Sequence, residues 1–447
     1  MGFLRVLMFL LRLIFGMTYL LSGYFKLVDP AGTQLVIMEY LTSFHLESLE
    51  FISAPLSIII PATEFVIGIA ILMCLRMKYT SLIAMIMTLF FTILTFFSAT
   101  FDLVSECGCF GEAIPADNWE TFVKNIILTL CIVPIFLFRN KFKKVATAPA
   151  EWILLGVYGV VAMGASLYSF THIPFLEFGQ YKVGTNISVK LENATDNTLF
   201  QNYFIYEKDG EEKEFSIDEL PDDSWNFVRS ESEYLGDISD LDFKMDIYNL
   251  AGVSIADEIA HRRSPSIIFS LYKPEDLNEK YWEKLSATID SVLVAGGMPY
   301  VLTHQIDQNI TNAYSRYPHI EPYLAIADRN TMISMVRSNG GVIYIDDGIV
   351  VKKWAGWKYT PKEIFDAVKT DSEEITLLES VRQTLVYELS ILIIFLIIIL
   401  FRYISGIIYG KKIKIIQLPK IPKIIDKKGR EEESEEIGKP EEENEII

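Results

Sequence analysis

Apolar residues gather in six long runs along this chain of 447 residues, separated by shorter polar segments. Each run approaches the ~20 residues that an α-helix needs to cross a bilayer core. Because backbone polar groups inside a bilayer must be satisfied within the segment, such spans are expected to be helices. The pattern predicts an integral membrane protein with spans at residues 4–25, 53–75, 79–100, 121–138, 152–171 and 386–405.

Basic residues between the spans predict how the chain is oriented in the membrane. The segments "RMK" (76–78), "RNKFKK" (139–144) and "GKKIKI" (410–415) fall on one side if the N-terminus is cytoplasmic. Lys and Arg are enriched in cytoplasmic loops. We therefore expect a bacterial inner-membrane protein with both termini in the cytoplasm and residues 172–384 in the periplasm.

Residues 172–384 have the composition of a soluble domain. The first part, 172–235, is expected to be a small β-rich segment with an Asp-Gly hairpin at 209–210. The second part alternates strands and helices in a regular order. The predicted order is a hairpin at 242–255, strands at 266–271, 300–303 and 323–327, helices at 275–295, 306–316 and 328–338, a hairpin at 340–354 and a helix at 361–369 capped by Thr360.

The order of these elements over residues 236–370 resembles a thioredoxin-like α/β domain of the peroxiredoxin or TlpA kind. The resemblance rests on that order and on the ending "VIYIDDGIVVKKW". However, residues 172–384 contain no cysteine, so the usual CxxC motif is absent. A dithiol enzyme needs a thiolate. This domain is therefore expected to bind or dock an extracytoplasmic partner protein, or to be a remnant of the fold.

Charge narrows the set of partners. The formal net charge of −18 and the pI of about 4.8 argue against nucleic acid as a ligand. Part of the acidity lies at the C-terminus, where residues 410–447 run from basic to acidic. This segment is predicted to be a disordered cytoplasmic tail whose basic part lies near anionic lipid.

Two of the four cysteines stand one residue apart in "ECGCFG", residues 106–111. Cys107 and Cys109 are predicted to face an oxidising compartment, where neighbouring thiols pair or exchange. Three readings stay open: redox exchange, a structural staple of the loop, and metal binding, although two thiolates without a nearby histidine are too few for a closed zinc site. Cys74 and Cys131 lie in apolar surroundings and are predicted to be structural.

Two ionisable residues of the spans are further candidates. Glu64 falls near the middle of the second span, where a carboxylate is costly and suggests function. Lys26 ends the first span and is the nearest plausible cation. If they pair, they form a polar site beneath the cysteine loop. Alternatively, Lys26 anchors its helix at the headgroups, and Glu64 is a protonated packing residue.

Three motifs of the first 140 residues resemble the DoxX/MauE family of four-helix membrane proteins. They are "LIFGMTYLLSGYFKLVDP" (13–30), "PATEFVIGIAIL" (61–72) and "CGCFG" (107–111). MauE is associated with disulfide formation in a periplasmic enzyme, and DoxX relatives with thiol and quinone oxidoreductases. The whole arrangement resembles a multidomain branch associated with Bacteroidota. The resemblance implies a four-helix domain over 1–145, a redox pair at Cys107 and Cys109, and a quinone as possible acceptor.

These observations favour a membrane redox protein in which Cys107 and Cys109 exchange thiol and disulfide equivalents, with Glu64 as proton acceptor and Lys26 as its electrostatic partner. A second hypothesis is a non-catalytic membrane scaffold that presents a partner-binding domain, with the two cysteines as a staple. A third is a small-solute transporter built around Glu64, although no internal repeat of the spans is detectable.

Overall fold

The computed structural model describes residues 2–101, 103–104, 111, 116–142, 146–195, 200–208, 211–216, 221, 225–234 and 243–416. Cys107 and Cys109 lie outside the described residues, as does the tail beyond residue 416. Predictions for those segments remain predictions.

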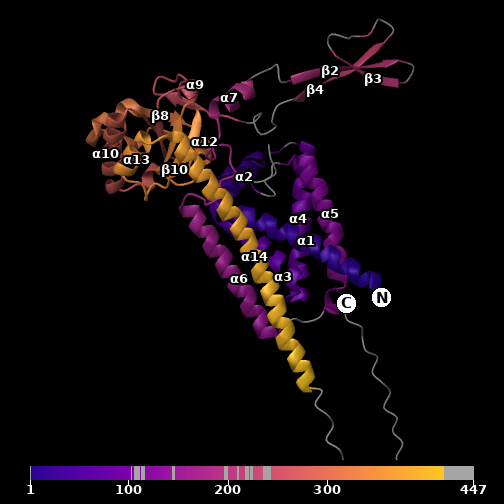
Figure 1. Ribbon diagram of the computed structural model, residues 1–447. Coiled ribbons are helices and arrows are strands. Elements are labelled where there is room, and N and C mark those ends of the chain that lie inside the picture. Colours follow the sequence, from indigo (N-terminus) through magenta and orange to yellow (C-terminus); the bar gives the residue numbers. More distant parts are fainter. Residues whose placement is uncertain are drawn as a thin grey trace, which may run out of the picture.

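Five described helices are long and apolar enough to cross a membrane, and they confirm the first five predicted spans to within a few residues. The sixth predicted span, 386–405, lies inside a 45-residue helix, α14, which begins at Ser372 and ends at Ile416. Figure 1 shows α14 running from the α/β part of the chain along the bundle. The five helices are α1 (Gly2–Val28), α3 (Ser53–Met73), α4 (Met77–Phe101), α5 (Asn118–Leu137) and α6 (Ala148–Thr171).

A short helix that was not expected lies between the first two spans. Residues Pro30–Ser43 form α2, followed by a 3₁₀ segment, η1, at Glu47–Ile52. Asp29 caps α2 by accepting a hydrogen bond from the backbone N–H of Gly32 at 3.1 Å, and Pro30 occupies the first turn. Asp29 followed by Pro30 is a typical start signal for a helix. The signal is easily missed because the segment mixes acidic and apolar residues.

Glycines let α1 and α3 pack backbone to backbone. A Cβ atom on Gly68 would lie 2.5 Å from the backbone nitrogen of Leu20, and one on Gly23 would overlap the backbone of Phe65. Small residues at helix contacts are typical of membrane bundles, where close van der Waals packing replaces the hydrophobic effect. At the far end of the same contact, the guanidinium of Arg12 donates to the carbonyl oxygens of Ile71 and Leu72 at 3.1 and 2.7 Å.

Residues beyond the bundle form an α/β domain around a six-stranded sheet with the order β10-β9-β6-β7-β8-β5. β6 pairs in parallel with β7, and β7 with β8, whereas β9, β10 and β5 are antiparallel to their neighbours. The strands are β5 (Ile247–Asn249), β6 (Ser266–Leu271), β7 (Met298–Thr303), β8 (Leu324–Ala327), β9 (Gly341–Asp346) and β10 (Ile349–Trp354).

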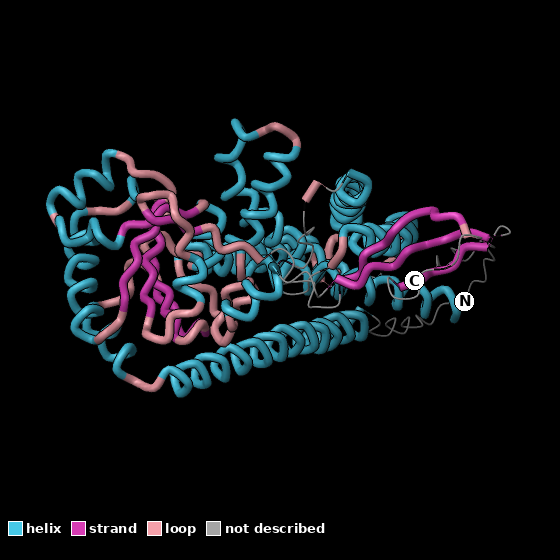
Figure 2. The backbone as a smooth tube through the Cα atoms, turned by 90° about the horizontal axis from the view of Figure 1, so that it is seen from above, coloured by secondary structure: helices cyan, strands magenta, loops and turns pink. Residues whose placement is uncertain are grey.

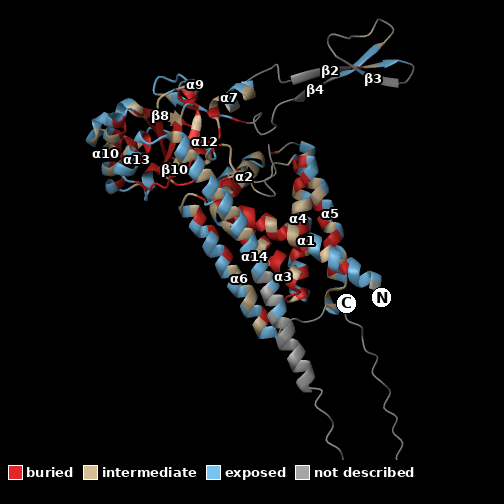
Figure 3. Cartoon of the chain, viewed as in Figure 1, coloured by how far each residue is buried: buried red, intermediate tan, exposed pale blue. Residues whose placement is uncertain are grey.

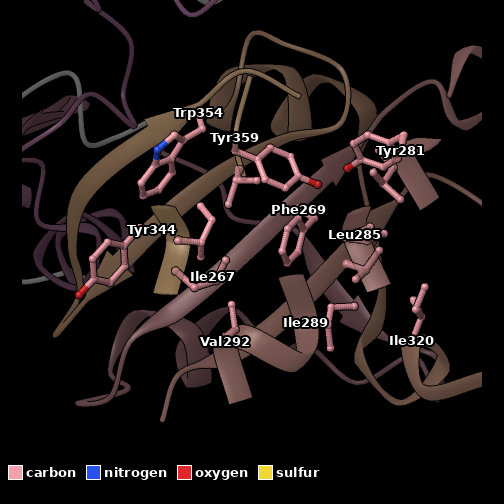
Figure 4. Close-up of a cluster of buried hydrophobic side chains, with 14 of the residues drawn as sticks. Ile267, Phe269, Tyr281, Leu285, Ile289, Val292, Ile320, Tyr344, Trp354 and Tyr359 are labelled. Atoms are coloured by element: carbon pink, nitrogen blue, oxygen red, sulfur yellow. The ribbon is translucent and has the colours of Figure 1, made fainter. Parts of the chain in front are cut away.

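Helices cover both faces of this sheet. One face packs against α10 (Glu279–Ala295), α11 (Gln308–Arg316) and α13 (Pro361–Lys369), and Figure 4 shows its buried side chains. The other face packs against α7 (Ile187–Thr195), α9 (Ala256–Ala260) and α12 (Arg329–Met335). Figure 3 shows that buried residues concentrate in this sheet and inside the bundle, whereas α6 is largely exposed.

Most predicted elements of this domain are confirmed, with corrections at the edges. The hairpin around Asp347 and Gly348 pairs as expected, and Thr360 and Glu363 form a capping box. The hairpin expected at 242–255 is shorter than predicted: Asn249 and Ile255 donate backbone N–H groups to the carbonyl oxygens of Val253 and Ile247, both at 2.9 Å, and β5 also pairs with β8. The helix expected at 328–338 ends at Met335.

The segment 172–235 is only partly β-structure. Helix α7 occupies 187–195, and the buried side chain of Ile187 joins the core of the α/β domain. The remainder contains a three-stranded antiparallel sheet with the order β3-β2-β4, in which β2 and β3 pair as far as Lys208 and Glu211. The predicted Asp-Gly turn at 209–210 lies outside the described residues. Figure 2 shows this sheet projecting away from the α/β domain. Its strands are β2 (Phe200–Lys208), β3 (Glu211–Ser216) and β4 (Asn226–Tyr234).

Buried ion pairs join the α/β domain to the bundle. Arg337, just after α12, donates from Nε and Nη2 to Asp29 Oδ2 at 3.2 and 2.9 Å, and both side chains are almost fully buried. Lys353 of β10 pairs with Glu177 at 3.1 Å; burial lowers the pKa of Lys353, and Glu177 opposes that shift. The carboxylate that caps α2 therefore also holds the α/β domain in place.

We predict that Gly68→Val destabilises the helical bundle by about 1–3 kcal/mol or more, because the new methyl groups overlap the backbone of α1. Thermal unfolding of the detergent-purified protein measures the effect. Gly164→Val is the control, since a Cβ at Gly164 of α6 meets no atom within 4 Å. Equal loss of stability in both variants would contradict the close crossing of α1 and α3.

We predict that Arg337→Met loosens the junction between α2 and the α/β domain, because it leaves Asp29 buried without its partner, a loss of about 3–5 kcal/mol. Faster hydrogen exchange at the amides of α2 would report the change. Arg316→Met removes an exposed ion pair with Glu279 and is expected to cost about 0–1 kcal/mol. If both variants leave α2 equally protected, the buried pair does not hold the junction.

Candidate functional site

A cavity of about 250 Å³ lies among α1, α2, α3, α4 and α5. α2 contributes Tyr40 and Phe44 to its lining, and α4 contributes Phe90 and Phe91. The walls are mostly apolar, with a few polar groups. The remaining polar or charged lining residues are Thr18, Tyr19, Ser22, Lys26, Thr33, Glu64, Thr95, Lys124 and Asn125.

A buried ion pair forms part of the cavity wall. The ammonium group of Lys26 donates to both carboxylate oxygens of Glu64, at 3.0 and 2.9 Å. Ser22, one helical turn before Lys26, donates to the same carboxylate at 3.0 Å. Lys26 is 6 % exposed and Glu64 3 %. The structure therefore brings together the two charged residues that the sequence singled out, and both are buried inside the bundle.

The pair depends on the crossing of α1 and α3. Glu64 precedes Phe65, whose backbone lies against Gly23, so the two helix axes are close where the charges meet. Moving two charges out of water costs several kcal/mol per ion, and good geometry with additional hydrogen bonds offsets that cost. The bidentate contact and the Ser22 hydroxyl supply that geometry, and Lys26 also lies 5.7 Å from the ring centre of Phe91.

Hydroxyl and amide groups line the side of the cavity formed by α4 and α5. The hydroxyls of Tyr19 and Thr88 are 2.6 Å apart, and Asn125 Nδ2 donates to Thr95 Oγ1 at 3.2 Å. Closer to the α4–α5 connection, Ser98 donates to Asn118 Oδ1 at 3.1 Å. Side chains of this kind hydrogen-bond between helices in membrane proteins. Of these residues, Tyr19, Thr95 and Asn125 line the cavity and give its mostly apolar wall a few polar groups.

The described ends of the cysteine segment lie beside this site. A Cβ atom on Gly111, two residues after Cys109, would lie 3.8 Å from Cγ of Lys26. Before the cysteines, Ser43 at the end of α2 donates to the carbonyl oxygen of Leu103 at 2.5 Å, and Asn118 donates to that of Val104. The residues before the cysteine segment thus contact the end of α2 and the start of α5, and the described residue after it lies near Lys26.

The other two cysteines match their prediction. Cys74 and Cys131 are both buried in the apolar core of the bundle. Sequence reasoning missed Ser22, Tyr19 and Asn125, which lie on helix faces among apolar residues. For Ser22 the spacing was an available signal, because it stands one helical turn before Lys26 and both side chains therefore face the same neighbour.

Taken together, these features define a multi-pass membrane protein whose apolar helices enclose a cavity with a buried ion pair. Residues 4–138, which contain the whole site, match the model of the family described as methylamine utilisation protein MauE. Residues 200–235 match a domain of unknown function (DUF8463). No curated protein and no solved structure matches the chain. The part of the chain that resembles MauE is therefore the helical bundle.

We predict that the ion pair shows strong energetic coupling. Lys26→Met and Glu64→Met each leave an uncompensated buried charge and should each cost about 3–5 kcal/mol, whereas the double variant should cost less than either. Unfolding in mixed micelles, followed by circular dichroism, measures the three free energies. Lys78→Met, at an exposed cation, is the control. Additive losses in the double variant would show that the two groups do not stabilise one another.

Proposed function

We propose that this protein is a bacterial inner-membrane thiol–disulfide exchange component, with both termini in the cytoplasm and the α/β domain in the periplasm. Cys107 and Cys109 are its redox pair, and a lipid-soluble acceptor of the quinone class is its second substrate. The observation that carries this proposal is the nearness of Gly111 to Lys26, since a Cβ atom on Gly111 would lie 3.8 Å from Cγ of Lys26. Because Gly111 follows Cys109 by two residues, the cysteine pair is expected within reach of the Lys26–Glu64 pair and the cavity.

The exchange reaction transfers two electrons. A thiolate of the partner protein attacks the Cys107–Cys109 disulfide, which forms a mixed disulfide and releases one cysteine as a thiolate. A second partner thiolate then displaces the other cysteine. The partner leaves as a disulfide, and Cys107 and Cys109 are left as two thiols. Reoxidation passes two electrons and two protons to the acceptor, which converts a quinone to a hydroquinone.

Lys26 and Glu64 suit the proton and charge changes of this cycle. An ammonium group near a cysteine favours the thiolate, which is the reactive form. Glu64 offers a carboxylate that can receive a proton at Oε1 or Oε2 when the cysteines are reoxidised. The aromatic walls and polar groups of the cavity are compatible with a flat acceptor ring. The choice of quinone comes from the resemblance to the DoxX/MauE family.

The α/β domain would dock the partner protein. Its topology, three parallel strands (β6, β7 and β8) flanked by the antiparallel hairpin β9–β10 and a closing helix, supports a thioredoxin-like fold. Residues 172–384 contain no cysteine, so this domain contributes no thiol chemistry. The same fact favours the rival function, a membrane scaffold in which the cysteine pair is only a staple. The two functions differ in whether the redox state of the pair responds to conditions.

We predict that the Cys107–Cys109 pair is partly oxidised in cells and becomes more reduced when respiration is inhibited. Acid trapping followed by a mass-shifting maleimide measures the thiols, and the buried residues Cys74 and Cys131 are removed by Ser substitution in the reference protein. Lys26→Met should slow reoxidation, because the thiolate is then less favoured. A Cys107→Ser or Cys109→Ser variant should trap a mixed disulfide with the partner.

If Cys107 and Cys109 stay fully oxidised, or fully reduced, in every condition, the proposed redox function is wrong. Unchanged function of the Cys107→Ser/Cys109→Ser double variant would then assign the scaffold.

A further inference from the structure

A second pocket, with a volume of about 260 Å³, lies on another side of α3, between α3, α4 and α6. It shares no lining residue with the cavity of the proposed redox site. Its walls are almost entirely apolar, and Ile59, Ile83 and Met163 at its rim are each about half exposed on the bundle surface. An apolar pocket that opens on the surface of a membrane bundle faces lipid chains.

A cation, Arg76, lies at the end of this pocket. Arg76 follows the last turn of α3, and its guanidinium carbon lies 5.1 Å from the ring centre of Tyr79 and 4.9 Å from that of Trp152. Within the described parts of the chain, no carboxylate forms an ion pair with this guanidinium, and its buried Nε has no hydrogen-bond partner. Two aromatic faces hold the group in place without neutralising it.

The nearest acidic group does not fill this role. Glu151, at the start of α6, is buried and accepts the backbone N–H of Arg76 and that of Ala146, both at 3.4 Å. Its carboxylate thus serves backbone donors, and the guanidinium keeps its hydrogen-bonding capacity. A planar guanidinium binds phosphate through paired N–H donors.

The same end of the bundle is positively charged over a wider area. Arg139 and Lys141 lie over the rings of Phe136 and Phe138, and Arg12 lies over Phe142. Cations and aromatic rings of this kind mark the level of the lipid headgroups. A ligand at the pocket would therefore place its charge at Arg76 and its apolar part among α3, α4 and α6.

We propose that this pocket is a binding site for an anionic phospholipid, with the headgroup phosphate on Arg76 and one acyl chain in the apolar pocket. An anionic phospholipid has both groups that complement this site, a negatively charged phosphate and an apolar chain. The phosphate neutralises the guanidinium, and the chain covers apolar walls with matching surface. The site is independent of the proposed redox function.

Native mass spectrometry of the full-length protein, titrated with phosphatidylglycerol or phosphatidylethanolamine, tests the proposal. The wild-type protein should bind phosphatidylglycerol about tenfold more tightly, a difference of about 1.4 kcal/mol. Arg76→Gln should abolish that preference. Gly159→Leu, which places a side chain in the pocket where a Cβ meets no atom within 4 Å, should weaken binding of both lipids.

Matched controls separate this site from general attraction to the basic end of the bundle. Lys78→Gln removes an exposed cation two residues from Arg76, and Gly164→Leu adds a side chain to α6 outside the pocket; both should bind lipid as the wild type does. The proposal is overturned if Arg76→Gln keeps the preference, if Lys78→Gln loses it equally, or if inorganic phosphate displaces the lipid.

Discussion

The close crossing of α1 and α3 is the constraint on which the rest of the site depends. Gly23 and Gly68 remove the side chains that would otherwise separate the two helices. Only then can Lys26 and Glu64 meet with both carboxylate oxygens engaged, buried inside the bundle. A lysine and a glutamate on more distant helices would each remain a lone charge in a bilayer, which is far more costly than the pair.

Sequence patterns predicted much of this arrangement because long apolar runs leave few alternatives to a transmembrane helix. They also singled out Lys26 and Glu64, since charges inside such runs are rare. Helix α2 escaped prediction because its apolar and polar residues follow no clear period, so the only signal was Asp29 followed by Pro30. The partners of the ion pair, above all Ser22, could not be chosen from sequence, because several hydroxyl residues lie on each helix and only the packed geometry selects one.

The α/β domain and the bundle share a junction rather than a flexible tether. Asp29 has two tasks, since one carboxylate oxygen caps α2 and the other accepts Arg337. α2 in turn lines the cavity through Tyr40 and Phe44. A chain of direct contacts thus joins the sheet of the α/β domain to the cavity wall. Local sequence likewise predicted only the turn in the expected hairpin at 242–255, because β5 also pairs with the edge of β8, a long-range contact that local sequence does not reveal.

The 45 residues of α14 extend about 68 Å at 1.5 Å per residue, more than twice the thickness of a bilayer core. The helix is unbroken from the α/β domain to Ile416, and the hydroxyls of Tyr24 and Ser390 join it to α1 partway along. Around that contact Val386, Tyr387 and Ile391 of α14 pack against the bundle, and nearer its start Glu379 pairs with Lys352 of β10. One continuous helix therefore binds both the bundle and the sheet of the α/β domain. A change in the angle between these two parts would have to bend α14 or break one of its two sets of contacts.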